Sequence, residues 1–341
     1  MTPSKIVFIG AACIFSTIAI AGFVKKSKKN KAVVFDAKVQ KEHVIKIDEA
    51  QTSIIKKENK VVAKQLPQVK KEVKKETKVQ DAQNDLPDTN IIDRLFATDS
   101  SRLPIVETVI YSSRVPWLQG KHAWISDYAT YYSTTRHFIA RSLNKKPDYF
   151  TQKVFPGDRF NVLAKDKNIN FYLLIDLSRA KMWFYYIDTD TNERTLLKSY
   201  SVGLGRKDAK KASGFLTPIG KYGLGNKVAI YKPGTMGYFQ ENKTEMIKVF
   251  GTRWIPFDKE IENCSEASRG FGIHGAPWVL QNGELIEDKS AVSKYGSDGC
   301  VRLASEDVEE LFSIIISRPT TVELVKDFFE AKLPGTEKKI N

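Results

Sequence analysis

The sequence predicts that the C-terminal half of the chain is a mainly β domain, a mixed and sandwich-like arrangement of strands with one or two helices. Two observations lead to this prediction. Apolar side chains alternate with a period of two in several segments after residue 166, which is typical of strands. One segment there, residues 305–316, has the apolar spacing of an amphipathic helix. Ahead of this domain, the composition predicts a small α+β subdomain, a disordered Lys-rich linker and an N-terminal transmembrane helix.

The 341 residues therefore divide into five predicted segments. In chain order they are a membrane anchor or signal segment (1–24), a Lys-rich flexible linker (25–90), a small α+β subdomain (91–165), the mainly β domain (166–330) and a C-terminal tail (331–341). Hydrophobic residues make up 42% of the chain, which is enough for a buried core and excludes a wholly disordered protein.

Residues 6–24 form a run of 19 residues without a charged side chain. At about 1.5 Å per residue, such a run is long enough to cross a bilayer as a helix. Lys5 and the small residues Ala19 and Ala21 also fit a cleaved signal segment, so both interpretations stand. The lysines that follow at residues 25–31 would place that side in the cytoplasm by the positive-inside rule. The chemistry described below favours export of the C-terminal part instead.

The net charge of +14 is concentrated in the linker. Residues 25–85 contain 17 Lys, no Arg and nine acidic residues, so they carry +8 of it. The same stretch has one aromatic residue, Phe35, and too few apolar groups to offset the entropy of ordering the backbone, which predicts a solvated tether. A nucleic-acid partner is not predicted, because that role needs basic residues interleaved with aromatic ones on a folded face.

The small subdomain is predicted to contain two short helices, over residues 124–132 and 138–144, followed by a turn at Pro156-Gly157 into a strand. An apolar stripe on the first helix is expected to face the core. It consists of Trp124, Ile125, Tyr128 and Tyr132.

This order of elements, over about residues 114–165, resembles a LysM (lysin motif) module. The usual opening Gly-Asp-Thr of that family is Gly120-Lys121-His122 in this chain. The resemblance implies glycan binding, and a small packing subdomain without a ligand is the alternative.

In the mainly β domain, residues 171–177 and 182–187 are predicted to form a hairpin with two largely apolar faces. Further strands are expected at 196–202, 220–224, 228–231 and 321–325. We expect Ser305 to cap the helix at 305–316, with Glu306 and Asp307 in its first turn.

The residues with catalytic potential lie in two segments before that helix. Cys300 and His274 lie in the segments Gly272-Ile273-His274-Gly275 and Ser297-Asp298-Gly299-Cys300-Val301-Arg302. A thiol becomes a good nucleophile beside an imidazole and a positive charge. Small residues before the cysteine let a carbonyl approach closely, and backbone N–H groups of the turn can stabilise an oxyanion.

These motifs, with residues 170–327 around them, resemble the L,D-transpeptidase catalytic domain family (YkuD-like). The resemblance implies Cys300 as the nucleophile, His274 as general base and acid, and the Gly275 carbonyl as the group that orients the imidazole. Many relatives have His where Asp298 stands. Residues of the same motif are predicted to shape the oxyanion and substrate pocket, and they are Ser297, Asp298, Gly299 and Arg302.

The implied reaction is attack of Cys300 on a tetrapeptide stem of peptidoglycan, release of D-alanine and transfer of the acyl group to an amine, with no metal or organic cofactor. An L,D-carboxypeptidase, with water as acceptor, and a noncatalytic peptidoglycan-binding protein are the alternatives. The implied location is the periplasm or cell envelope, with the chain anchored in the inner membrane by residues 6–24.

The same residues allow competing interpretations. Cys264 and Cys300 could form a disulfide, or hold zinc together with His274. Gly203 and Gly205 lack the third glycine of a dinucleotide fingerprint, so a strand bend is favoured there. Residues 281–293 are expected to form an inserted loop in which Glu287 and Lys289 alter substrate access.

Overall fold

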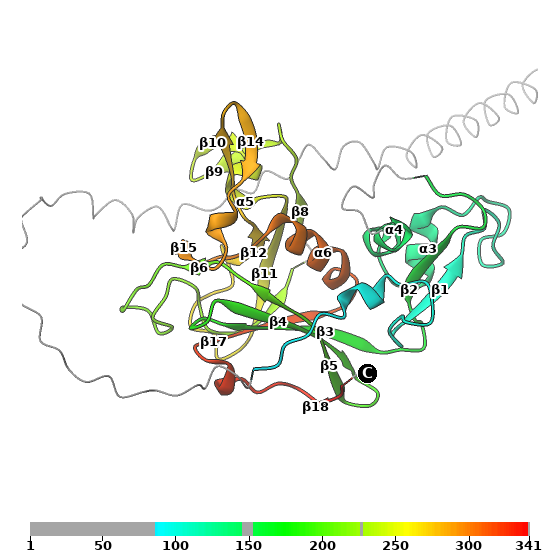
Figure 1. The fold of residues 1–341 in the computed structure, drawn as a ribbon, viewed down its shortest axis with the longest axis horizontal. Helices are drawn as coiled ribbons and strands as arrows, with labels where there is room; N and C mark the ends of the chain where they lie inside the picture. Colours follow the sequence, from blue (N-terminus) through cyan, green and yellow to red (C-terminus); the bar gives the residue numbers. More distant parts are fainter. Residues whose placement is uncertain (1–85, 145–152, 226–227, 340–341) are drawn as a thin grey trace, which may run out of the picture. The chain divides into compact units, whose positions relative to one another are not determined.

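The computed structural model describes residues 86–144, 153–225 and 228–339 (Figure 1). The predicted transmembrane segment and almost all of the Lys-rich linker lie outside these residues. No helix within the described ranges is long and apolar enough to cross a membrane. Apart from residues 237–242, the described residues belong to one compact unit.

The predicted hairpin is confirmed and forms the centre of the fold. β3 (Ile169–Asp176) pairs antiparallel with β4 (Lys181–Asp188), and β4 pairs with β5 (Glu193–Ser201). Both faces of the hairpin are buried, as its two-sided apolar pattern predicts. Leu173 and Phe184 belong to the main core, whereas Leu174 and Trp183 pack in a second cluster on the other face.

The mainly β prediction is confirmed, and the strands form one continuous, curled, mixed sheet of ten strands (Figure 1). Its order is β16-β12-β11-β7-β17-β3-β4-β5-β18, with β8 paired to β11. The strands not yet described are β7 (Gly220–Leu224), β8 (Ala229–Ile230), β11 (Arg253–Glu262), β12 (Gly272–Gly275), β16 (Val301–Leu303), β17 (Thr320–Val325) and β18 (Thr336–Glu337).

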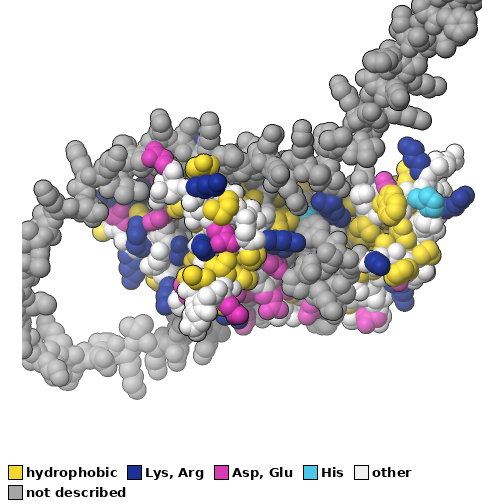
Figure 2. Space-filling view, turned by 90° about the horizontal axis from the view of Figure 1, so that it is seen from above, with side chains coloured by type: hydrophobic (Ala, Val, Ile, Leu, Met, Phe, Trp, Pro, Cys, Tyr) yellow, Lys and Arg dark blue, Asp and Glu magenta, His cyan; other side chains and the backbone are white. Residues whose placement is uncertain are grey.

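Shorter elements complete this domain. They are η2 (Ile92–Leu95), β6 (Leu204–Gly205), β9 (Met236–Phe239), β10 (Asn242–Glu245), α5 (Ile247–Phe250), β15 (Tyr295–Ser297) and η4 (Phe328–Glu330). β15 pairs parallel with β6, which matters for the site described below. Figure 2 shows hydrophobic side chains mixed with both basic and acidic ones on the face seen from above.

The predicted helix is α6 (Ser305–Ile315), and its apolar stripe, including Val308, Leu311 and Phe312, is buried in the main core. The expectation that Ser305 caps this helix is wrong. Ala304 is the N-cap, and the Ser305 N–H donates to Glu287 Oε1 at 2.5 Å.

The segment expected to be an inserted loop is ordered. β13 (Trp278–Gln281) and β14 (Glu284–Glu287) form a hairpin that is followed by η3 (Lys289–Ala291). Glu287 caps α6 from this hairpin, so its carboxylate has a structural partner. Val279 and Leu280 are exposed on the hairpin.

The small subdomain has the order strand, helix, helix, strand. β1 (Val106–Ile110) pairs antiparallel with β2 (Arg159–Leu163), and α3 (Ile125–Tyr131) and α4 (Arg136–Asn144) connect them. Its own core contains Tyr128, Ile139 and Phe160. Trp124, expected in the core-facing stripe, is 66% exposed because it precedes the first helical turn.

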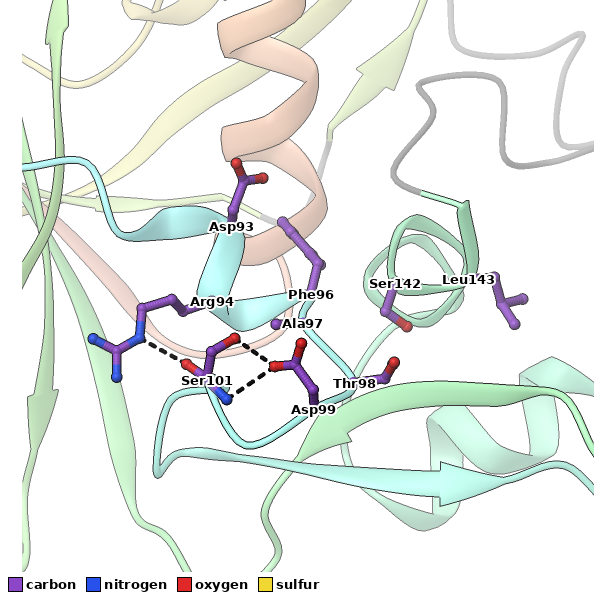
Figure 3. A pocket seen from close by; sticks show the side chains of 9 residues that line it. All are labelled: Asp93, Arg94, Phe96, Ala97, Thr98, Asp99, Ser101, Ser142 and Leu143. Carbon is purple, nitrogen blue, oxygen red and sulfur yellow. Dashed lines mark hydrogen bonds between the residues drawn. The ribbon is translucent and has the colours of Figure 1, made fainter.

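This subdomain contacts the larger domain through buried charges. Glu310 of α6 accepts from Lys198 Nζ at 2.6 Å and from the Tyr200 hydroxyl at 3.0 Å, and it lies 3.8 Å from Arg141 of α4. Nearby, a hollow lies between η2, the loop that follows it and α4 (Figure 3). Arg94 Nε donates to the Ser101 carbonyl at 2.7 Å beside this hollow.

Candidate active site

Two neighbouring parallel strands bring the predicted nucleophile and base together. In the pairing of β12 with β16, His274 lies opposite Arg302 and Ile273 opposite Val301. Because side chains alternate along a strand, His274 and Arg302 share one face of the sheet. Cys300 directly precedes β16, two residues before Arg302. The spacing of strands and residues puts its Cα roughly 8 Å from that of His274.

The turn before β16 is fixed by one serine. Ser297 is 1% exposed, and its hydroxyl donates to the Cys300 carbonyl at 2.6 Å and accepts from the Gly299 N–H at 3.1 Å. Gly299 has a φ of +122°, and a Cβ there would lie 2.5 Å from a ring carbon of Phe271. Only glycine fits this position, since any side chain would clash and be strained. The turn therefore holds Cys300 in a defined place.

His274 is buried among aromatic side chains. Its ring lies 5.5 Å from that of Phe250 and 6.0 Å from that of Trp254, centroid to centroid. Nδ1 is 2.8 Å from the Gly275 carbonyl oxygen. A carbonyl can only accept, so Nδ1 carries the proton and the neutral ring keeps its lone pair on Nε2. The predicted orienting role of Gly275 is consistent with this contact.

Burial lowers the pKa of His274 to about 4, and the positive charge of Arg302 acts in the same direction. The backbone carbonyls of Gly275 and Phe250 oppose this change, because they favour the charged form of the ring. His274 is therefore a neutral imidazole at pH 7.

Cys300 is partly buried, and its Sγ lies 3.6 Å from the Gly270 carbonyl oxygen. Burial raises the pKa of the thiol to about 12. A hydrogen bond from the Gly272 N–H and the charge of Arg302 act against this rise, whereas Asp298 adds to it. Thiol and imidazole are thus both neutral at pH 7, so that any chemistry at Cys300 would need proton transfer to form the thiolate.

Arg302 has a hydrogen-bond donor without a partner among the described residues. Its Nε is buried and has no hydrogen-bond partner among the residues that the structure describes. A buried donor without an acceptor destabilises the folded state, and binding of a group that accepts its hydrogen bond removes this cost. The guanidinium is therefore suited to an anionic or carbonyl group near Cys300.

Asp298, the other charged residue of the motif, is exposed and pairs with Arg206 at 2.6 Å. Its carboxylate is thus engaged in an ion pair at the rim of the turn. A direct role for Asp298 in binding substrate stays a prediction.

The competing interpretations receive little support. Both Cys264 and Cys300 are free thiols, and Cys264 Sγ lies 3.0 Å from the Lys221 carbonyl oxygen, in a separate contact. No group of three or more candidate metal ligands occurs within the described ranges. Gly203 bridges to Arg302 and Gly205 lies in β6, so both support the catalytic turn through backbone contacts.

Sequence reasoning missed the residues that surround this turn from distant segments. The Arg206 N–H donates to the Ser297 carbonyl at 3.0 Å, and Thr217 Oγ1 accepts from the Gly205 N–H at 2.7 Å. Phe250 and Trp254 enclose His274. None of them stands near Cys300 or His274 in a motif, so pairing of the strands was needed to find them.

Residues 170–324 match the family model of the L,D-transpeptidase catalytic domain, YkuD. No curated protein matches the chain. Two solved structures are similar to it, each with a TM-score of 0.32. Bd1075 of Bdellovibrio bacteriovorus is 15% identical, over 46% of this chain and 48% of that one. The helical cell shape determining protein Pgp2 of Campylobacter jejuni is 17% identical, over 50% of this chain and 51% of that one.

The chain thus spans about half the length of the solved structures it matches. The family match covers both motifs of the site, from before β12 to after α6. Residues 170–324, slightly less than half of the chain, are therefore similar to the L,D-transpeptidase catalytic domain family, YkuD.

Proposed function

We propose that the chain is a cysteine-dependent L,D-transpeptidase that cross-links peptidoglycan stem peptides. The observation that carries this proposal is the parallel pairing of β12 with β16 within the region that matches YkuD, which sets His274 opposite Arg302, two residues from Cys300. Ser297 and Gly299 support the proposal, because they hold the turn from which the thiol projects.

In the first step, Cys300 Sγ attacks the carbonyl carbon of the third residue of a tetrapeptide stem. His274 Nε2 takes the thiol proton, so that a neutral thiol becomes a thiolate only as the new C–S bond forms. Backbone N–H groups of the turn and Arg302 stabilise the oxyanion. The C–N bond to the terminal D-alanine then breaks, and its amine leaves with the proton held by His274.

In the second step, an amine of a neighbouring stem attacks the thioester. His274 takes a proton from this amine and returns one to the sulfur, so an amide forms and the thiol is restored. Water in place of the amine would give a tripeptide and make the enzyme an L,D-carboxypeptidase.

We propose further that the domain acts outside the cytoplasm, in the periplasm or cell envelope, anchored by residues 6–24 and carried on the Lys-rich linker. The strand-helix-helix-strand order of the small subdomain supports a LysM-like role in holding glycan. The linker charge of +8 between residues 25 and 85 would attract an anionic wall, with an attraction that weakens at high salt.

The test is incubation of the full-length protein with purified tetrapeptide muropeptides, with products identified by mass. Dimers that lack one D-alanine support the transpeptidase, and tripeptides alone support the carboxypeptidase. The Cys300→Ala variant should form neither product. Cys264→Ala is the matched control, since it removes the other free thiol of the described domain, and it should retain activity.

A further inference from the structure

A basic loop, residues 206–216, adjoins the turn that carries Cys300. It contains Arg206, Lys207, Lys210 and Lys211 against one carboxylate, Asp208. The loop is closed at its base, because Leu216 N–H donates to the Arg206 carbonyl at 2.8 Å and Asp208 N–H to the Gly214 carbonyl at 2.9 Å. The sequence alone gives these cations no role.

Both ends of the basic loop touch the catalytic turn. The Arg206 N–H donates to the Ser297 carbonyl at 3.0 Å. A Cβ on Gly299 would lie 2.9 Å from the Leu216 carbonyl oxygen. The cations of the loop are therefore held beside the nucleophile.

Two ion pairs connect the basic loop to segments on either side of Cys300. Arg206 pairs with Asp298 of the turn at 2.6 Å, and Lys211 pairs with Glu266 at 2.8 Å. Glu266 belongs to the loop that ends at Gly270, whose carbonyl oxygen lies 3.6 Å from Cys300 Sγ. Two cations of the basic loop, Arg206 and Lys211, thus pair with carboxylates of segments that adjoin Cys300.

Both pairs are open to solvent, with side chains about two-thirds exposed in the first pair and about one-third exposed in the second. Exposed ion pairs contribute little to stability, so exchanging one carboxylate for another costs little. We infer that Arg206 and Lys211 recognise free carboxylates of the stem peptide, which replace Asp298 and Glu266 as their partners when substrate binds. This inference rests on the proposed function and adds the chemical feature by which the donor stem is selected.

The test compares two tetrapeptide stems, one with free carboxylates and one with those groups converted to amides. We expect the full-length protein to have a higher kcat/KM for the acidic stem, with a ratio that shrinks at high salt. Arg206→Gln with Lys211→Gln should lower kcat/KM for the acidic stem roughly tenfold, as loss of hydrogen bonds to a charged group predicts, and change the amidated stem little.

The Asp298→Asn variant distinguishes recognition of stem carboxylates by Arg206 from a purely structural role of the Arg206–Asp298 pair. It releases Arg206 from its internal partner, so the KM for the acidic stem should fall. If the pair were only structural, Asp298→Asn and Arg206→Gln would act in the same direction and on both stems alike, and that result would overturn the inference. Lys338→Gln is the matched control, because it removes an exposed ion pair with Glu193 at the opposite edge of the sheet.

Failure of the proposed function is detected separately. Release of the fourth residue from either stem, as D-alanine or as its amide, supports it, whatever the ratio between stems. If neither stem is processed, titration of the Cys300→Ala variant with both stems still decides the inference. Tighter binding of the acidic stem supports it, and equal binding contradicts it.

Discussion

The ionisation of Cys300 gives a direct prediction about the proposed nucleophile. With a pKa of about 12, against 9.0 for an ordinary thiol, Cys300 has about a thousandfold less thiolate at pH 7. Only about one molecule in 100,000 then carries the thiolate. Burial causes this, since Arg302 and the Gly272 N–H offset it only in part.

The assay is alkylation by iodoacetamide between pH 6 and pH 10, followed by mass spectrometry of the peptide that contains Cys300. A Cys264→Ala background confines the described thiols to this one. We expect the rate to rise about tenfold per pH unit over the whole range. A plateau below pH 8 would show a preformed thiolate and imidazolium pair, and it would refute the general-base mechanism.

Neighbouring charges should move this titration in opposite directions. Arg302→Gln removes a charge that lowers the pKa of Cys300, so alkylation at a given pH should slow. Asp298→Asn removes a charge that raises it, so alkylation should quicken. If both substitutions changed the alkylation rate in the same direction, the cause would be a disturbed turn and not a change in electrostatics.

Three further predictions concern stability. The pKa of His274 is about 4 in the folded chain and 6.5 in the unfolded chain, so the unfolded chain binds more protons between these values. The contribution of His274 to the free energy of unfolding is therefore fully present above pH 6.5 and falls by about 3 kcal/mol towards pH 4. Urea denaturation at each pH should show this fall, and a less steep one in His274→Gln. Gly299→Ala forces a Cβ against Phe271 and the Leu216 carbonyl, so we expect a loss of about 2 to 4 kcal/mol by the same method, and a stable variant would contradict the assigned turn. Glu287→Ala should lower the free energy of unfolding by about 1 kcal/mol through loss of the contact with Ser305, and it should leave kcat unchanged. Glu287→Gln should lower it less. A changed kcat would indicate that Glu287 affects substrate access.

The parts of the fold that could be predicted are those with a strong local pattern. Two apolar runs separated by a short turn marked β3 and β4, and a single apolar stripe marked α6. β11 was missed because Pro256 and the charged residues after it break the apolar alternation. That strand is specified by its pairing with β7 and β12, which is a long-range property of the chain.

The residues of the site likewise divide into those that a local motif reveals and those that only strand pairing reveals. His274 and Cys300 stand in short motifs, so their roles could be proposed from the sequence. Arg206 and Trp254 could not be assigned, because β15 must pair with β6 and β12 with β11 before these residues meet the site. The contact of Glu287 with α6 was missed for a related reason, since its partner Ser305 is 18 residues away.

The central claim is that Cys300 forms an acyl-enzyme with a peptidoglycan stem. The most direct measurement is mass spectrometry of the full-length protein mixed with a tetrapeptide stem in the absence of an amine acceptor. The account predicts an adduct equal to the stem without its D-alanine, located on the peptide that contains Cys300 and absent from Cys300→Ala. D-alanine release that persists in Cys300→Ala would contradict the account.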